Sequence, residues 1–574
     1  MTDKTMAHQA GSKQRRLGKL ALTLAAGVSM AAIVGVSQPT PVMAQKAGES
    51  AKLGAYLAAR VAGTGRDLGA AVEYYDKVLM VDPDNPDLLS AASLFMLADG
   101  QVEKAIAAAE RLLEFRPDEG PALLLASVGK VTEGDYAAAA ELVAAVPLTG
   151  INRFLGPLVE AWILVGLGQV DGAFTALEKL SINSSFATMQ IYHTALISQF
   201  DGRFEDAEAQ FQLMLEGGVS SRGVEAYGGF MESQGRADEA ATLYQNFLAV
   251  APDDEIIGAA LTRQQSGAAA TPLIADVSAG LAEALQGMAA TLTQENAFNP
   301  ARNFAQLALY LWPDLEPAMT ALANTMEQEE LWPLANEVLA KVPADSAYSW
   351  GARMRIAVNL GRMDEVDAAD DILEQMAGER PDRVEALISL GDIMRSAGRF
   401  EDSVAAYDRA MDRIVQLSQG DWVLLYTRGT VLERSGDWER AEADFLQALE
   451  LEPDQPFILN YLGYSWIEMG RNVEEATEMI ERAVAQRPTA GFIVDSLGWG
   501  HYMLGNYEEA VRQLERAVQL TPGDSTINEH LGDAYWRVGR KREATFQWQH
   551  ALDLGPEDEQ LPIVLKKLEQ GLDI

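Results

Sequence analysis

The stretch from Asp495 to Pro522 concentrates side chains that could do chemistry. It reads DSLGWGHYMLGNYEEAVRQLERAVQLTP, with Trp499, His501 and Tyr502 following a carboxylate at its head. A histidine near a carboxylate could act in general acid–base catalysis, and aromatic rings could bind a peptide or a sugar. The same composition could equally be the packing pattern of a repeated unit. The rest of the sequence has to distinguish a site from a repeat.

The five histidines do not form a recognisable metal or catalytic motif. They are His8, His193, His501, His530 and His550. None belongs to an HExxH or HxH pattern, and none has a carboxylate at a metal-site spacing. His501 occupies a position that is expected to pack between helices. We therefore expect no metal site.

Phosphate-binding and nucleophile motifs are also missing from the sequence. It contains no GxGxxG and no GxxxxGK[ST]. Ser496, in DSLGW, lies within a predicted helix rather than at the strand-to-helix turn that a nucleophile elbow needs. The acidic VDPDNPD of 81–87 lacks the central glycine and the distal glutamate of a calcium loop, and it is read as a turn. The sequence therefore predicts no catalytic residue, no cofactor and a protein that is not an enzyme.

Composition narrows the classes of partner. The 574 residues include no cysteine, which excludes disulfides, thiol catalysis and a lipid attached to an N-terminal cysteine. The net charge of −39 makes nucleic acid and anionic membrane surfaces poor partners, because both are themselves negative. We expect this charge to form a solvated acidic exterior that keeps a large protein soluble.

The first 44 residues are typical of an export signal. A basic stretch, SKQRRLGKL, leads into the 17-residue apolar run of 20–36, and Val42 and Ala44 place small side chains at the −3 and −1 positions before Gln45. Signal peptidase requires such short side chains. We expect a cleavable signal peptide over 1–44 and a periplasmic mature protein. The alternative is an inner-membrane anchor facing the periplasm, because the apolar run reaches the lower limit of a membrane span.

A period of about 34 residues runs through the chain. Pro83 and Pro117 are separated by this distance, and each proline of the series follows a helix-like run, where a helix has to stop. Glycine and alanine positions repeat with the same step. The C-terminal members of the three series are Pro488, Pro522 and Pro556; Gly429, Gly463, Gly498 and Gly532; and Ala441, Ala476, Ala510 and Ala544.

Each unit contains two amphipathic segments. In 491–524 the first is FIVDSLGWGHYML and the second is YEEAVRQLERAVQL. Ala510, Leu514 and Ala517 form the i, i+4, i+7 stripe of the second helix. Gly498 and Ala510 are predicted where the two antiparallel helices approach most closely, because a larger side chain there would push them apart.

This pattern, a Leu-Gly pair and an aromatic residue, then Ala, a bulky apolar residue and Ala with a closing Pro, resembles the tetratricopeptide repeat (TPR). Residues 425–453, 459–488, 494–522 and 529–556 match it closely, and looser copies precede them. The resemblance implies an all-α fold, a right-handed superhelical solenoid of antiparallel helix pairs, with roughly fourteen units over 51–558. Such a scaffold has many uses, so the resemblance is more specific for fold than for function.

Two irregular segments interrupt the array. Residues 255–278, EIIGAALTRQQSGAAATPLIADVS, break the period and are read as a hinge or an insertion between an N-terminal degenerate array (45–254) and a C-terminal array (279–558). Residues 559–574 are expected to form a capping helix that covers the open end of the stack. Its predicted apolar face holds Leu561, Val564, Leu565 and Leu568, and its polar face Lys566, Lys567 and Glu569. The strongest units are 384–420, 422–455, 456–490, 491–524 and 525–558.

The C-terminal half is also similar to periplasmic TPR adaptor proteins of gram-negative bacteria that partner C-terminal processing proteases. The similarity lies in LGYSW, DSLGWGHY and HLGDAYW. It implies a non-enzymatic adaptor that binds protein or peptide partners and presents envelope proteins, such as cell-wall hydrolases, to a protease. Two alternatives remain: a TPR component of an exopolysaccharide export machine, and a carbohydrate-binding envelope protein that stacks sugars on Trp499, Tyr502 and Trp536.

In TPR solenoids the first helix of each unit lines a concave groove, and helical spacing predicts which side chains face it. Aromatic and carboxamide side chains there suit a peptide, while Asp495, Glu529 and Asp533 favour a neutral or basic one. The opposing interpretation is that Trp499 and Trp536 only pack against the next helix. The predicted partner-binding positions are Tyr426, Asn460, Tyr464, Asp495, Trp499, Tyr502, Glu529, Asp533 and Trp536.

Overall fold

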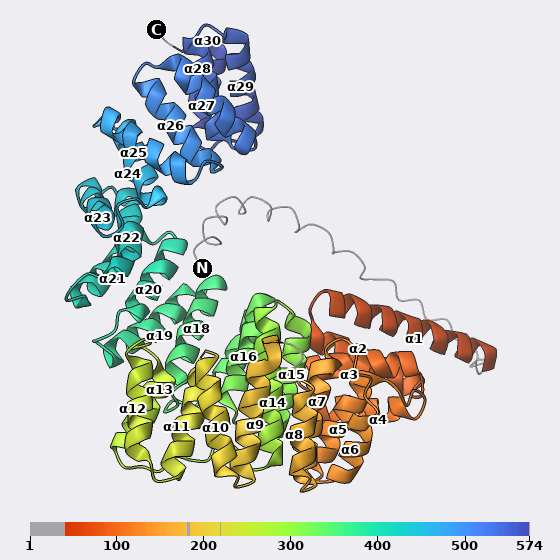
Figure 1. Ribbon diagram of the computed structural model, residues 1–574. Coiled ribbons are helices and arrows are strands. Elements are labelled where there is room, and N and C mark those ends of the chain that lie inside the picture. Colours follow the sequence, from red (N-terminus) through yellow and green to blue (C-terminus); the bar gives the residue numbers. More distant parts are fainter. Residues whose placement is uncertain (1–40, 181–183, 219, 573–574) are drawn as a thin grey trace. The chain divides into compact units, whose positions relative to one another are not determined.

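A computed structural model describes residues 41–180, 184–218 and 220–572, which form helices joined by short loops (Figure 1). Within these ranges there is no β-strand. The predicted all-α solenoid of antiparallel helix pairs is therefore confirmed. The predicted signal peptide lies outside the described residues, except for its last four positions, which begin the first helix. None of the helices in the described ranges combines the length and the apolar character needed to cross a bilayer.

The chain divides into two compact units. The first ends at Pro83, and its described part consists of α1 (Pro41–Thr64) and α2 (Leu68–Val81), which pack against each other. The second unit begins at Asp84 and contains all the other helices.

The N-terminal part of the second unit contains eleven helices. They are α3 (Pro86–Ala98), α4 (Val102–Leu113), α5 (Gly120–Thr132), α6 (Tyr136–Ala144), α7 (Asn152–Gly166), α8 (Val170–Glu178), α9 (Ser184–Phe200), α10 (Phe204–Glu216), α11 (Ser221–Ser233), α12 (Ala237–Leu248) and α13 (Glu255–Gln265).

The C-terminal part follows after a non-helical stretch. Its helices are α14 (Val277–Gln294), α15 (Phe298–Leu311), α16 (Glu316–Gln328), α17 (Trp332–Leu339), α18 (Ser349–Arg362), α19 (Val366–Glu379), α20 (Glu385–Ser396), α21 (Phe400–Arg413), the short 3-10 helix η2 (Gln419–Asp421), α22 (Trp422–Arg434), α23 (Trp438–Leu451), α24 (Pro456–Glu468), α25 (Val473–Gln486), α26 (Gly491–Met503), α27 (Tyr507–Leu520), α28 (Ser525–Arg537), α29 (Lys541–Asp553) and α30 (Leu561–Gln570).

Consecutive α-helices in the described ranges form fourteen pairs, with α13 and α30 outside the pairing. Within a pair the first helix ends at a tight turn that needs a left-handed backbone, and in most pairs a glycine supplies it. Asn296, Glu330 and Asp364 take this conformation at the turns after α14, α16 and α18. Gly505, with φ of 79°, makes this turn between α26 and α27. The turn explains why the two helices of a pair are antiparallel neighbours.

A glycine in the first helix lets an aromatic or aliphatic side chain of the second helix approach. A Cβ added at Gly498 would lie 2.6 Å from Leu514 Cγ, and one added at Gly532 would lie 2.4 Å from the ring of Trp548. Ala510, on the facing helix, is fully buried. The predicted close approach of the two helices is found at Gly498, where the facing residue is Leu514, and the glycine is required because a Cβ would occupy the space of that side chain.

The helices α14 and α15 also pack against helices much earlier in the chain. α14 contacts α7 and α9, and α15 contacts α3, α4 and α5 (Figure 1). A Cβ on Gly280 would lie 2.2 Å from the ring of Trp162. One turn later Glu283, only 1% exposed, accepts hydrogen bonds from Tyr192 at 2.9 Å and from Arg222 at 2.8 and 3.1 Å. The chain therefore folds back, and α14 covers one face of the N-terminal array.

Residues 255–278 include a helix as well as an irregular stretch. α13 occupies the first part, and a segment without helix follows from Ser266 to Asp276. Glu255, at the start of α13, forms an ion pair with Arg383, which lies 128 residues later in the loop before α20. This segment is thus tied to the C-terminal array by a charge pair as well as by the chain.

The last helix, α30, packs on the end of the array through Val564, which is fully buried and clusters with Leu531 and Trp548. The sequence-based assignment of its faces was wrong at two positions. Leu565 is 42% exposed, whereas Lys567 is largely buried and pairs with two carboxylates. Two buried carboxylates offset the cost of removing an ammonium group from water, which helical periodicity alone does not show.

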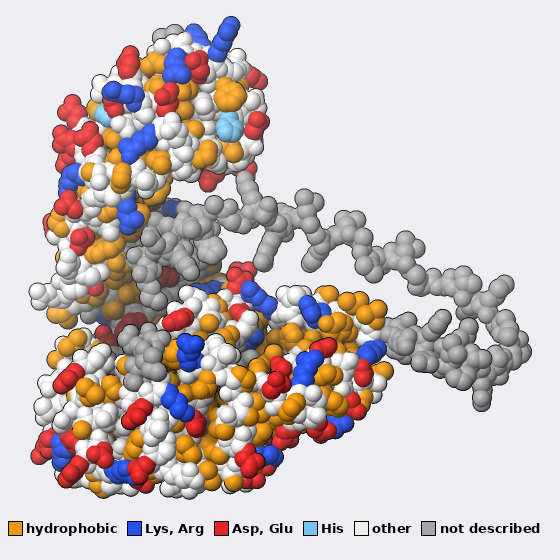
Figure 2. Space-filling view, turned by 45° about the vertical axis from the view of Figure 1, so that its right-hand side comes forward, with side chains coloured by type: hydrophobic (Ala, Val, Ile, Leu, Met, Phe, Trp, Pro, Cys, Tyr) orange, Lys and Arg blue, Asp and Glu red, His pale blue; other side chains and the backbone are white. Residues whose placement is uncertain are grey.

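The surface reflects the acidic composition. Figure 2 shows acidic side chains spread over the visible face, with lysines and arginines among them. Many basic groups of the chain are paired with carboxylates. Arg409 on α21 pairs with Glu374 on α19 of the preceding helix pair, and Arg482 on α25 pairs with Asp454 in the loop before α24. Such exposed pairs contribute little to stability individually, about 0–1 kcal/mol each.

Candidate functional site

All nine predicted groove residues lie on the first helices of the last four pairs. Their side chains differ in how far they are already engaged within the protein. α22 carries Tyr426; α24 carries Asn460 and Tyr464; α26 carries Asp495, Trp499 and Tyr502; and α28 carries Glu529, Asp533 and Trp536.

Tyr426 and its neighbours on α24 are partly or fully covered. The ring of Tyr426 lies 6.1 Å from that of Phe445 and 6.0 Å from that of Tyr461, so it packs between helices. Burial raises the pKa of Tyr426 to about 12. Asn460 is 9% exposed, and its Oδ1 accepts no hydrogen bond from the described residues. Burial also raises the pKa of Tyr464, with Glu468 adding to the effect, so its hydroxyl stays neutral.

The aromatic residues on α26 form a stack with His530 of α28. Trp499 stacks on His530 at 4.1 Å and on Tyr502 at 4.6 Å between ring centroids, and its Nε1 donates to Glu468 at 2.5 Å. Asp495, 5% exposed, places both carboxylate oxygens 3.1 Å from His530 Nδ1. The aromatic and acidic groups of this helix thus already have partners within the chain.

The two carboxylates on α28 are also paired. Lys567, from α30, lies 2.7 Å from both Glu529 and Asp533, and Trp548 Nε1 donates to Asp533 at 2.9 Å. Burial raises the pKa of Asp533, although Lys567 and Trp548 act in the opposite direction. Trp536 packs against Trp548 at 5.3 Å. The negative charge expected to attract a basic partner is therefore largely satisfied by His530 and Lys567, two residues that the sequence did not assign to the groove.

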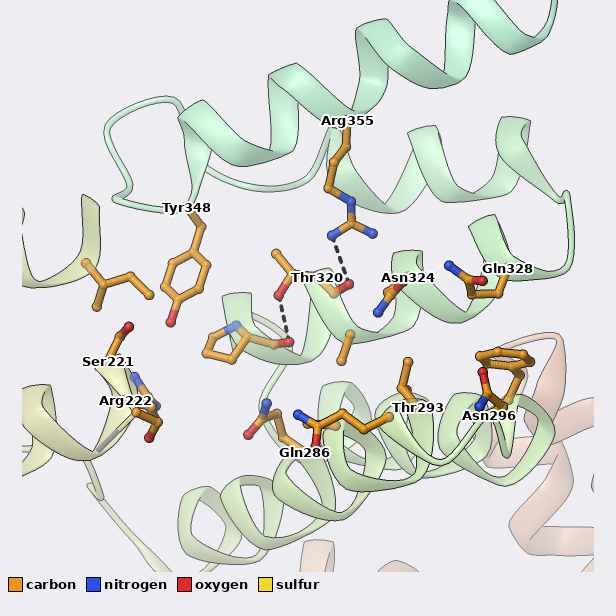
Figure 3. Close-up of a pocket in the computed structure, with 17 residues that line it drawn as sticks. Ser221, Arg222, Gln286, Thr293, Asn296, Thr320, Asn324, Gln328, Tyr348 and Arg355 are labelled. Carbon is orange, nitrogen blue, oxygen red and sulfur yellow. Dashed lines mark hydrogen bonds between the residues drawn. The ribbon is translucent and has the colours of Figure 1, made fainter. Parts of the chain in front are cut away.

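A second candidate site lies where α14 meets α11, α16 and α18, four first helices of their pairs. A cavity of about 580 Å³ opens between them (Figure 3). This volume falls within the range of about 300–1,000 Å³ that is usual for ligand pockets. We call it the α14–α16 cavity, because these two helices contribute most of its lining. It is lined by carboxamide side chains, those of Gln286, Gln294, Asn296, Asn324 and Gln328.

The carboxamides of the α14–α16 cavity are free to bind a ligand. None of the five makes a side-chain hydrogen bond to another described residue. Asn359, a carboxamide behind the cavity, behaves differently: it is 2% exposed and donates to Glu327 and Asn336, both at 2.9 Å. The cavity thus exposes donors and acceptors that the fold does not use.

The two cations at the edge of the cavity are neutralised within the chain. Arg222 pairs with Glu283 at 2.8 Å and with Glu225 at 2.9 Å. Arg355 donates to both oxygens of Glu327 at 2.9–3.2 Å and to the carbonyl of Thr320 at 3.1 Å. The lining therefore offers hydrogen bonds without a net charge.

The hydroxyl groups of the cavity complete this neutral lining. Thr320 donates to the carbonyl of Pro317 at 2.9 Å and Thr293 to that of Ala289 at 2.8 Å, so each hydroxyl oxygen remains an acceptor for a ligand. Burial raises the pKa of Tyr348, which keeps its hydroxyl protonated as a donor. Figure 3 shows Tyr348 and Ser221 at one end of the cavity and Asn296 and Gln328 at the other.

The sequence did not predict this site, because the repeats that surround the cavity match the repeat pattern less closely than the C-terminal ones. A signal was present: Thr320, Asn324 and Gln328 follow one another at intervals of four, which places polar side chains on one face of a helix. The lining from α11 is contributed by a segment about 100 residues earlier, and no local pattern announces that contact.

Comparisons with protein families identify the repeated unit. A model described as TPR repeat matches residues 501–539, and models described as tetratricopeptide repeat match 65–128, 354–414 and 426–491. A TPR repeat-containing protein of Pseudomonas aeruginosa is 30% identical over 154 residues, 27% of this chain and 26% of that protein. Human tetratricopeptide repeat protein 13 is 33% identical over 107 residues, 19% of this chain and 12% of that protein. The chain thus spans about a quarter or less of the length of these relatives.

Among solved structures, similar chains include three helical-repeat proteins. The Cut9–Hcn1 hetero-tetramer of APC/C matches at 16% identity, over 85% of this chain and 96% of that one, with a TM-score of 0.35. Yeast Tom70 matches at 13% identity, over 92% and 96%, with a TM-score of 0.29. YrrB, described as a TPR protein with an unusual peptide-binding site, matches at 18% identity, over 34% and 97%, with a TM-score of 0.28. From the family matches we conclude that the chain contains tetratricopeptide repeats in at least four stretches.

Proposed function

We propose that the chain is a non-enzymatic scaffold that binds protein or peptide partners through the first helices of its helix pairs. The observation that carries this proposal is the α14–α16 cavity, where five carboxamides on or beside first helices have no hydrogen-bond partner in the described residues. Gln286 and Asn324 are half-buried, and Gln294, Asn296 and Gln328 are exposed, so the cavity presents all five amide groups to a ligand. A half-buried amide without a protein partner is costly unless water or a ligand satisfies it. TPR proteins generally bind protein or peptide partners, which agrees with this use of the surface.

We further propose that the scaffold acts in the cell envelope. The basic and apolar segments of 1–44 and the small residues before Gln45 support export of the chain. The LGYSW, DSLGWGHY and HLGDAYW segments support an adaptor that presents envelope substrates to a C-terminal processing protease. Trp499, within the second of these segments, lies on a first helix, as a partner-binding residue would.

Affinity capture of the tagged full-length chain from envelope extracts tests this proposal. We expect a processing protease or a cell-wall hydrolase to be enriched over a tag-only control. Enrichment of export-complex proteins would instead favour the exopolysaccharide role, and retention of glycans alone would rule out the adaptor. We call the surface of the nine predicted groove residues on α22, α24, α26 and α28 the C-terminal groove. The double variant Trp499→Ala and Tyr464→Ala measures how much this groove contributes to the capture of partners.

Export is tested separately by determining the N-terminus of the protein purified from the envelope fraction. The proposal expects a mature chain that begins at Gln45. An intact N-terminus in the membrane fraction would mean that the apolar run of 20–36 is retained as an anchor. Recovery of the uncleaved chain from the cytoplasm would contradict envelope function altogether.

A further inference from the structure

We infer that the α14–α16 cavity binds a short extended peptide segment of low charge through its main chain, with the segment lying parallel to the two helices. This inference rests on the proposed function, since it specifies how a peptide partner would be held. It differs from the groove predicted from the sequence in location, in the residues involved and in the chemistry of the ligand.

The first observation is the spacing of the polar side chains. Thr320, Asn324 and Gln328 lie at positions i, i+4 and i+8 of α16, all of them in the lining of the cavity. Side chains four residues apart on a helix are separated by about 6 Å along its axis. In an extended peptide, groups that point the same way recur every two residues, at about 6.6 Å. The two repeats are close enough for successive side chains of the stripe to meet alternate residues of one peptide.

The second observation is a matching stripe on the facing helix. Gln286, Ala290 and Gln294 occupy positions i, i+4 and i+8 of α14 and also line the cavity. Each lies one repeat period before its counterpart on α16, so the two stripes are equivalent positions of neighbouring units. An extended peptide between them has one edge toward each helix, and alternate residues direct their N–H and C=O groups to opposite edges.

The chemistry of the stripes suits a main chain. A carboxamide presents an acceptor oxygen and a donor NH2 group, so one side chain can pair with both the N–H and the C=O of a peptide residue. Ala290 and Ala321 are the small residues of the lining, and they leave room for side chains of the peptide. From Gln286 to Gln294 the stripe extends about 12 Å, which corresponds to about four residues of extended chain.

The charge of the cavity decides what kind of segment fits. Arg222 and Arg355 are paired with Glu283 and Glu327, so neither is available as a counter-ion. A lysine or glutamate side chain entering the cavity would lose water without gaining an opposite charge, which is costly. Uncharged residues are therefore preferred in the four-residue core.

The stripes are confined to these two helices. One repeat period further on, α18 has Met354 and Val358 in place of Thr320 and Asn324, and neither can hydrogen-bond a main chain. Arg362 stands in place of Gln328 but does not line the cavity. The polar surface thus forms one site rather than a continuous band along the array. A neutral oligosaccharide would also use carboxamides, but its binding does not depend on peptide N–H groups, and this difference is the basis of the test.

The test uses the full-length chain and an array of random uncharged octapeptides, acetylated and amidated at their ends. We expect binding to peptides that form extended chains, and loss of that binding when alternate backbone nitrogens of a bound peptide are methylated. Affinities are measured by fluorescence anisotropy with the labelled peptide. Asn324→Leu with Gln328→Leu, or Gln286→Leu with Gln294→Leu, should each weaken binding about tenfold or more, the effect of two hydrogen bonds of ordinary strength.

Controls separate this effect from misfolding and from the loss of any surface carboxamide. Gln549→Leu removes an exposed carboxamide on α29, a second helix, and should leave binding unchanged. Hydrogen exchange over α14 and α16 reports whether the leucine variants keep their fold. Two properties make leucine suitable: it is close to asparagine in size, and it offers no hydrogen bond.

Three binding results and one capture result would overturn the inference. Equal binding of N-methylated peptides would show that the main chain is not recognised. Undiminished binding by the folded leucine variants would place the peptide elsewhere. Binding of maltohexaose, with no peptide retained, would make the cavity a sugar site. If envelope partners are still captured by the leucine variants but lost with Trp499→Ala and Tyr464→Ala, this inference fails while the proposed scaffold function stands.

Discussion

Two buried histidines have opposite protonation preferences because their ring nitrogens face different partners. His193, 1% exposed, accepts a hydrogen bond at Nδ1 from Trp162 Nε1 at 3.2 Å. His530, 7% exposed, instead has its Nδ1 between the two carboxylate oxygens of Asp495. An indole N–H requires a lone pair on the imidazole, whereas a carboxylate favours a proton there.

His193 is predicted to make the fold sensitive to acid. Burial lowers its pKa to about 4, with Glu283 acting weakly in the opposite direction. Since the unfolded value is about 6.5, the neutral ring stabilises the fold above that pH, and about 3 kcal/mol is lost as pH falls from 6.5 toward 4. His193→Asn keeps an acceptor but does not titrate. Local unfolding free energies from hydrogen exchange should therefore show the wild type losing stability relative to this variant on acidification.

His530 is predicted to make the fold less stable as pH rises. Burial alone would lower its pKa, but the charge and hydrogen bond of Asp495, together with Asp533 and Glu529, outweigh burial and raise it. Its stabilisation is complete below about 6.5 and is lost as pH rises through the higher folded value. His530→Asn can still donate a hydrogen bond to Asp495 but does not titrate. The difference in local unfolding free energy between the wild type and this variant, measured over α26–α28, should therefore shrink above pH 6.5. The same pH trend for both asparagine variants would contradict one of the two assignments.

The side chains of the C-terminal groove show what a sequence can and cannot say at this scale. Helical spacing placed Asp495, Trp499 and Asp533 on first helices, as found. It could not show that Lys567 reaches Asp533, because α30 lies outside the repeat and its orientation depends on packing at the end of the stack. Pairing between separate elements is decided by side-chain geometry, which a period does not contain.

At the scale of the helix pair, the repeat depends on contact between a glycine and a large side chain. Gly391 faces Tyr407, Gly429 faces Phe445 and Gly532 faces Trp548, each from first helix to second. The large partner is fully buried in these pairs. The pairs were predictable from the sequence because the contact is local and recurs every 34 residues or so.

Gly532→Ala is predicted to destabilise α28 and α29, because the new methyl group would lie 2.4 Å from the ring of Trp548. Overpacking of this kind costs about 1–3 kcal/mol. Gly351 provides a matched control: it lies in α18 with nothing within 4 Å of an added Cβ, so Gly351→Ala should be neutral or stabilising by up to about 1 kcal/mol. Local stability measured by hydrogen exchange distinguishes the two variants. Equal changes in stability would mean that the close approach of α28 and α29 does not exclude a methyl group.

At the scale of the whole second unit, the main departure from a simple repeat array is the return of α14 to the N-terminal array. Solenoid units normally contact only their neighbours in sequence. Here Tyr192 and Glu283 are 91 residues apart and Glu255 and Arg383 are 128 apart, yet each pair is in contact. The sequence predicted an interruption at 255–278, but not this return, because contacts between distant degenerate repeats leave no periodic signal.

The return is predicted to depend on the buried pair of Arg222 and Glu283. Burial opposes ionisation of Glu283, but Arg222 and Tyr192 outweigh it and hold the pKa of this carboxyl below its usual range. Glu283→Gln leaves Arg222 without its main partner and should cost about 3–5 kcal/mol. This loss should appear as faster hydrogen exchange in α7, α9 and α14 together. The pair stabilises above the ordinary glutamate pKa of about 4.3, and this contribution is lost as pH falls through the lower folded value.

A surface pair serves as the control for this prediction. Glu239 pairs with Arg236 at 2.8 Å but is 58% exposed, so water screens the pair and Glu239→Gln should change stability little. If Glu283→Gln has no larger effect than Glu239→Gln, the ion pair does not hold α14 in place, and apolar contacts such as that of Gly280 with Trp162 must do so alone.

The position of α14 also has a consequence for the order in which the helices fold during synthesis. Translation supplies α3 to α12 first, and they can fold pair by pair because their contacts are local. Gly280 of α14 packs against the ring of Trp162, so this side of the indole stays uncovered until residues 277–294 have emerged. The N-terminal array is therefore completed by a helix from the following one, and a ribosome stalled before residue 277 would carry a folded but uncovered array, open to chaperones.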